Sequence, residues 1–244
     1  MFLIYQLTVT RALTVYVAQG LVCAWFAYLA YRILKRDRKR INLIFAGFYL
    51  SAVIGLFFNF IYAPLADETV VKYLNYITNF GIFYSPIFLV VFDLILLKSE
   101  KVINTFKQLL ILIGFGIFIF CMIFFIETPD WGITLNADTD WSPEWSLPFF
   151  LYLIIGVSLF AVGPKLYLSF KIYNKFEDEQ LKKKWKFFIF GFCALIIFMY
   201  GIFLSNFLAS YDINIRLVMG IIGLLLAISG GYLMYSGVGR QLEK

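Results

Sequence analysis

Three polar side chains inside a long apolar run are the best-placed residues of this sequence for chemistry. Asn75, Asn79 and Asp93 share one helical face with Pro86, because at 100° per residue these positions lie within about 40° of one another. Polar side chains are costly against lipid, so we expect this face to point into a helix bundle. The two asparagines are candidates for ligand binding, with hydrogen bonding between helices as the alternative.

Asp93 is the candidate switch residue of the same run. It precedes Lys98 by five positions and therefore lies close to one end of the predicted helix. A carboxylate there either titrates as a switch or proton-handling group, or bonds to neighbouring helix ends and loop lysines. We count Asp93 as the one charge truly inside the membrane.

A second set of candidates lies in the polar segment 127–146, which holds Trp131, Trp141 and Trp145. Tryptophan is typical of the membrane–water interface, so we expect this segment to fold back over the mouth of the bundle. A ligand lid that uses Trp131 and Trp141 is the functional alternative. The acids here resemble a calcium loop only faintly, because Trp141 stands where the turn glycine is needed.

The usual groups for catalysis and metal binding are missing from the sequence. There is no histidine, and Cys23, Cys121 and Cys193 lie far apart within apolar runs. No paired carboxylates and no nucleophile with a neighbouring base are visible. We therefore predict no enzymatic activity, no cofactor and no metal site.

The composition indicates what must position these residues. Hydrophobic residues make up 62% and charged residues 15% of the chain, whereas about a quarter of a soluble globular domain is charged. A soluble domain is excluded, and so is a nucleic-acid partner, since the net charge of +6 reflects unequal loops. We predict an all-α integral membrane protein with a single domain over residues 1–244.

Seven apolar stretches reach the length of about 20 residues that a helix needs to cross a bilayer. They predict helices near 10–33, 42–63, 71–97, 107–126, 148–172, 187–208 and 214–236. Lys and Arg gather on alternate connections, with Arg11, Lys72 and Arg216 as the exceptions. The positive-inside rule then places the N-terminus outside and the C-terminus in the cytoplasm of a seven-helix bundle. Abundant Phe, Ile, Lys and Asn suit a microbial plasma membrane.

The last predicted helix carries small residues three or four positions apart. Small residues let two helices in a membrane approach closely, so we expect a packing seam here, with a moving hinge as the alternative. The seam consists of Gly220, Gly223, Ala227 and Gly231.

The segment Lys175–Lys186 mixes three acids with lysines on both sides. We expect it to touch anionic membrane lipids, and docking of a cytoplasmic partner stays open. Its stretch Glu179–Lys183, which leads into Phe187–Gly191, resembles the loop before the sixth helix of seven-helix sensor modules. These modules form the N-terminal membrane region of some microbial histidine kinases. Helix count, orientation and short links are also similar over most of the chain, but we expect no kinase domain to follow.

The resemblance implies a sensor-like bundle without an enzymatic output. We therefore predict a stand-alone, receptor-like or accessory membrane protein that senses a small or lipidic ligand and acts through a cytoplasmic signalling partner. The alternative is a transporter or channel-like subunit with a polar path along the third helix. The scarcity of buried charge speaks against that alternative.

Overall fold

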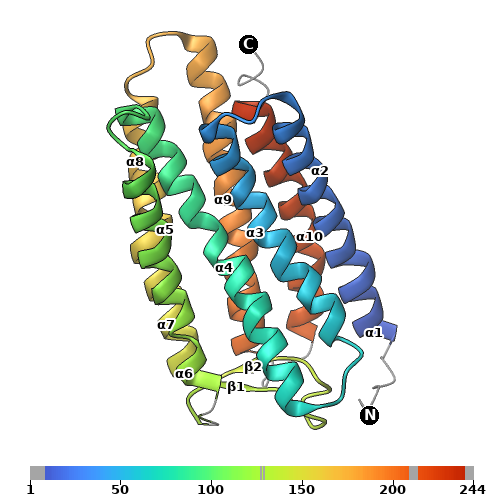
Figure 1. The fold of residues 1–244 in the computed structure, drawn as a ribbon. Helices are drawn as coiled ribbons and strands as arrows, with labels where there is room; N and C mark the ends of the chain where they lie inside the picture. The colour runs from blue at the N-terminus through green and yellow to red at the C-terminus, as the bar shows by residue number, and fades with distance from the viewer. Residues whose placement is uncertain (1–8, 127, 129, 209–213, 240–244) are drawn as a thin grey trace.

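The computed structural model describes residues 9–126, 128, 130–208 and 214–239, and it is a bundle of long helices (Figure 1). Three of the helical segments, named η, have the wider π-helical turn. In chain order the helical elements are α1 (Val9–Ala12), η1 (Leu13–Gln19), α2 (Gly20–Arg36), α3 (Arg40–Tyr62), α4 (Glu68–Lys98), α5 (Thr105–Phe120), α6 (Ile123–Ile126), α7 (Leu147–Val157), η2 (Ser158–Val162), α8 (Gly163–Tyr173), α9 (Glu179–Phe207), α10 (Asn214–Met234) and η3 (Tyr235–Gly239).

Seven continuous helices within the described residues are long and apolar enough to cross a membrane. They cover Leu13–Arg36, Arg40–Tyr62, Glu68–Lys98, Thr105–Ile126, Leu147–Tyr173, Glu179–Phe207 and Val218–Val238. The expected all-α bundle with seven helices of membrane-spanning length is therefore confirmed. The architecture is that of a multi-pass membrane protein.

Side-chain caps explain where four of the long helices begin. The side chains of Asp67, Asn104, Ser146 and Asp178 each accept a hydrogen bond from an amide of the first helical turn. The cap at Asp178 moves the start of α9 to Glu179, eight residues before the predicted start at residue 187. Most of the segment Lys175–Lys186 is therefore helical rather than a loop.

Helix α4 lies at the centre of the bundle and packs against α3, α5, η2 and α8. Helix α9 packs against α7, α8 and α10, and α2 packs against both α3 and α10. Because α4 has neighbours on several sides, Ile87 and Val91 are buried as fully as Asn75, Asn79 and Asp93. The polar face of α4 is therefore one of several inward faces.

The two ends of the bundle differ in character (Figure 1). At one end lie the connections that contain Asp37–Lys39, Ser99–Asn104 and Asn174–Asp178, and we call this the basic end. At the opposite end, β1 (Ile133–Thr134) pairs antiparallel with β2 (Glu144–Trp145), and we call this the strand end. Trp145 packs its ring against Phe83 of α4, Phe149 of α7 and Phe203 of α9. The segment 130–146 thus folds over the bundle mouth, as its tryptophans predict.

Close helix packing along α10 involves most of the small residues expected there. Ala227 is fully buried, a Cβ on Gly231 would lie 3.1 Å from Trp25 Nε1, and a Cβ on Gly223 would lie 2.6 Å from the ring of Phe198. Gly220 differs from the expectation, because a Cβ there would have no described residue within 4 Å. Its place in the seam is taken by Gly230, which faces Gly191 of α9.

Candidate functional site

A buried ion pair joins α4 to α8. The Nζ of Lys165 lies 2.9 Å from the Oδ2 of Asp93, and both side chains are 0% exposed. Ser169, one turn after Lys165, donates its hydroxyl to the same carboxylate oxygen at 2.6 Å and also accepts a bond from the lysine. Trp185 of α9 donates its indole N–H to the main-chain oxygen of Ser169 at 2.9 Å. The cluster therefore ties three helices together.

Aromatic rings of α9 cover the ammonium of Lys165. Its Nζ lies 4.3 Å from the ring centroid of Phe188, 5.0 Å from that of Phe192 and 5.8 Å from that of Trp185. A desolvated ammonium over aromatic faces gains cation–π attraction, which partly replaces its lost hydration. The positive half of the pair is therefore well compensated.

The negative half of the pair is compensated less completely. Asp93 Oδ2 receives bonds from both Lys165 and Ser169, but Oδ1 has no hydrogen-bond partner among the described residues. A buried polar atom without a partner is destabilising, and more so when it carries charge. The orphaned Oδ1 is therefore a cost of burying this pair that no described side chain offsets.

Local backbone structure turns Lys165 into the bundle. The π-helical segment η2 ends where the amide of Gly163 bonds to the carbonyl of Ser158, five residues earlier. Such a segment takes up one extra residue and rotates the side chains that follow by about 100° relative to an uninterrupted α-helix. Pro164, which has no N–H, follows directly and weakens the helix at the same point. Single π-turns of this kind are frequent at functional sites.

The sequence pattern alone misses this partner of Asp93. In the sequence, Lys165 belongs to a series of basic residues that leads to the basic end, so the pattern assigns it to a connection and leaves Asp93 as the one charge inside the membrane. That prediction is wrong, because Lys165 lies within the span Leu147–Tyr173 and is fully buried. The signal that could have found it is the Gly163–Pro164 step inside an apolar run, with Ser169 one turn further on.

Asn75 and Asn79 lie toward the strand end of α4 and bond to each other. The amide of Asn79 donates to Asn75 Oδ1 at 2.9 Å, and the amide of Asn75 donates to the hydroxyl of Tyr62 on α3 at 2.8 Å. Both asparagines are buried. This arrangement favours hydrogen bonding between helices over ligand binding.

The polar face of α4 is interrupted between Asn79 and Asp93. Apart from Ser85, the buried side chains of α4 in this interval are apolar or absent, and they include Phe83, Ile87 and Val90. Ser85 is the one polar buried side chain of α4 in this interval, and its hydroxyl already bonds to the carbonyl of Ile82, so this face of α4 offers water few hydrogen-bonding partners. The asparagine pair and the ion pair are therefore two separate polar clusters on one helix.

The two tryptophans proposed as a ligand lid lie in different surroundings. Trp131 is 63% exposed, whereas Trp141 is 7% exposed and belongs to the core. Asp140 and Trp141 both adopt the left-handed conformation, with φ of 53° and 55°, and this sharp turn directs the Trp141 ring inward. Arg11 of α1 donates a hydrogen bond to the carbonyl of Asp140. The segment is thereby anchored to α1.

The segment Lys175–Lys186 presents cations at the basic end. Lys182 pairs with Glu179 at 2.8 Å, while the side chains of Lys183 and Lys184 are exposed. Trp185 faces the opposite way and reaches the ion-pair cluster. In the neighbouring connection, a hydrogen bond from Lys39 holds the pKa of the Asp37 carboxyl below its ordinary value. A charged surface and the buried cluster are thus linked through the first two turns of α9.

Within the described residues, no group of three or more His, Cys, Asp or Glu side chains is arranged to hold a metal ion. Neither the comparison with protein-family models nor that with curated proteins produced a match for this chain.

Proposed function

We propose that this protein is a membrane sensor subunit, in which the Asp93–Lys165 pair is the switch and the basic end engages a cytoplasmic signalling partner. The observation that carries the proposal is a fully buried ion pair at the meeting point of α4, α8 and α9. Ionisable residues inside a membrane bundle are costly and are typically functional. The resemblance of Glu179–Lys183 to the loop of histidine-kinase sensor modules supports the same function.

Stability alone is a weak reason for such a pair. The desolvation of two buried charges offsets most of their attraction, so apolar residues of the same volume would hold the helices equally well. A switch, in contrast, needs two arrangements that differ by only a few kcal/mol. The orphaned Asp93 Oδ1 and the weakened backbone at η2 and Pro164 both lower the cost of separating α8 from α4.

The proposal includes an orientation, with the basic end in the cytoplasm and the strand end outside. We expect a membrane-impermeant thiol reagent to label an Ala137→Cys variant in intact cells and to leave a Lys101→Cys variant unlabelled. Both positions are exposed, and they lie at opposite ends of the bundle. The background for both variants replaces Cys23, Cys121 and Cys193 with alanine. Labelling of Lys101→Cys from outside would reverse the orientation.

The switch itself is tested by the distance between spin labels at Lys101 and Lys175, two exposed positions at the basic end after α4 and α8. In lipid nanodiscs, we expect Lys165→Met to add a longer-distance population, because α8 is no longer held to Asp93. Lys171→Met is the matched control, since Lys171 lies on the same helix with an exposed side chain. A folded Lys165→Met protein with the wild-type distance distribution would contradict the switch.

A transporter remains the second candidate function, because Lys165 adds a second charge to the membrane interior. The apolar stretch between Asn79 and Asp93 speaks against a continuous polar path. Proteoliposomes that carry a pH gradient separate the two functions. Proton flux that disappears in Asp93→Asn would favour the transporter, and the absence of flux favours the sensor.

A further inference from the structure

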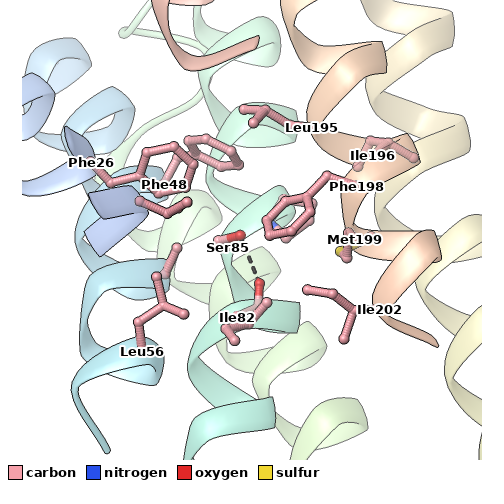
Figure 2. Close-up of a pocket in the computed structure, with 13 residues that line it drawn as sticks. Phe26, Phe48, Leu56, Ile82, Ser85, Leu195, Ile196, Phe198, Met199 and Ile202 are labelled. Carbon is pink, nitrogen blue, oxygen red and sulfur yellow. Dashed lines mark hydrogen bonds between the residues drawn. The ribbon is translucent and has the colours of Figure 1, made fainter. Parts of the chain in front are cut away.

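An apolar cavity lies in the middle of the bundle, away from the polar clusters described above. Its volume is about 40 Å³, and its walls come from α2, α3, α4 and α9 (Figure 2). Its lining includes Phe26, Phe48, Leu195 and Met199, and Ser85 is the only polar side chain among the lining residues that the structure describes. The cavity is only partly enclosed, so it differs from the few sealed voids of close-packed protein interiors and a small molecule can enter it.

The part of α4 that lines the cavity offers polar ligands no free hydrogen-bond donor. Pro86 has no N–H, so it leaves the carbonyl of Ile82, four residues earlier, without its usual helical donor. The hydroxyl of Ser85 donates to that carbonyl at 2.7 Å (Figure 2). The proton of the only polar side chain at the cavity is thus engaged within its own helix, and water would find too few partners there.

We infer that this cavity binds a small, uncharged, apolar molecule drawn from the membrane, and that it is the ligand site of the proposed sensor. That the bound molecule is the sensed ligand rests on the proposed function. That the cavity binds an apolar molecule rests only on the cavity itself. One ordered water needs about 10–15 Å³ on this scale. The space therefore suits a molecule of a few heavy atoms, and a free apolar solute or the end of a lipid chain has the required chemistry.

Two helices connect the cavity to the ion pair. On α4, Pro86 lines the cavity and Asp93 follows two turns later, about 10 Å along the helix axis. On α9, Leu195 lines the cavity, and Phe192 covers the ammonium of Lys165 one turn earlier. A ligand that separates α4 from α9 at the cavity therefore moves the carboxylate of Asp93 relative to the ring of Phe192, which covers the ammonium of Lys165.

Xenon is the probe for the binding site, because it is small, uncharged and apolar. We expect saturation-transfer ¹²⁹Xe NMR of the protein in short-chain detergent micelles to detect a bound resonance. Ala52→Leu should abolish it, since Ala52 lines the cavity and leucine fills the space. Ala24→Leu is the matched control, because it adds the same side chain at an exposed position of α2 and should leave the resonance intact. Ala52→Val, which adds less volume, serves if Ala52→Leu does not fold.

The absence of a bound resonance from the wild type in micelles, or its persistence in a folded Ala52→Leu variant, would overturn the inference. A resonance seen in micelles but lost in lipid nanodiscs would support the apolar site and assign its occupant to a lipid chain end. A resonance retained in nanodiscs would support a free solute. The spin-label measurement on Lys165→Met needs no ligand, so failure of the switch and failure of the cavity site are separate results.

Discussion

Replacing Lys165 with methionine is expected to lower the free energy of unfolding by about 3–5 kcal/mol, the cost of breaking a buried ion pair on one side. Methionine keeps nearly the volume of the lysine stem, so the loss is electrostatic rather than a packing defect. Asp93 would retain only the hydroxyl of Ser169 as a donor, and its Oδ1 already has no partner in the described part of the chain. Reversible unfolding in detergent micelles measures the difference.

The double variant Asp93→Leu/Lys165→Met tests whether the unpaired charge of Asp93 causes the loss of stability in Lys165→Met. Since both charges are removed and the volume is filled with apolar atoms, most of the lost stability should return. Lys171→Met, on the exposed side of the same helix, should change stability by no more than about 0.5 kcal/mol. A double variant as unstable as Lys165→Met would show that packing around Phe188 and Phe192, not the pair, carries the stability.

The seven helices could be predicted because apolar length is a local property of the sequence. The ends of the helices depend on single capping residues. For this reason α9 begins at Glu179 and not at the predicted residue 187. Asp178 offers its carboxylate to the amides of Gln180 and Leu181, so the helix forms through a charged stretch that hydropathy assigns to a loop. Capping is a stronger signal than hydropathy in that segment.

Of the two residues of the buried ion pair, Asp93 could be predicted as a site residue and Lys165 could not. Asp93 is conspicuous because it stands alone in an apolar run, whereas Lys165 stands at the start of a basic series. The direction of its side chain depends on η2, which hydropathy does not detect and for which the Gly163–Pro164 step is the only sign in the sequence. Asn75 and Asn79 are buried, as their shared face predicts, but the hydrogen bond from Asn75 to Tyr62 of α3 could not be predicted, because it depends on how two helices pack.

The tryptophans of the strand end show the same limit. Trp131 and Trp141 have equal propensity for an interface, yet one is exposed and the other is in the core. Two consecutive left-handed residues, Asp140 and Trp141, produce the difference. A non-glycine residue seldom adopts this conformation, so no composition argument would place it here.

The contact between α9 and α10 leads to the second large expected effect, at Gly191. A Cβ at Gly191 would lie 2.6 Å from both the carbonyl oxygen of Gly230 and the amide nitrogen of Met234. These are backbone atoms, so the two helices themselves must separate. We expect Gly191→Ala to lower the free energy of unfolding by about 1–3 kcal/mol, the usual cost of overpacking.

Gly114→Ala is the matched control, and the opposite sign is expected for it. Gly114 lies inside α5, and a Cβ there would have nothing within 4 Å. Alanine should therefore stabilise the helix by up to about 1 kcal/mol through its higher helix propensity. Gly220→Ala should behave like Gly114→Ala, since a Cβ at Gly220 is equally unopposed. If unfolding in micelles shows Gly220→Ala to be as destabilising as Gly191→Ala, the seam also runs through Gly220, as small-residue spacing alone suggests. If Gly191→Ala is as stable as the wild type, the close approach at Gly191 and Gly230 is not what holds α10 in place.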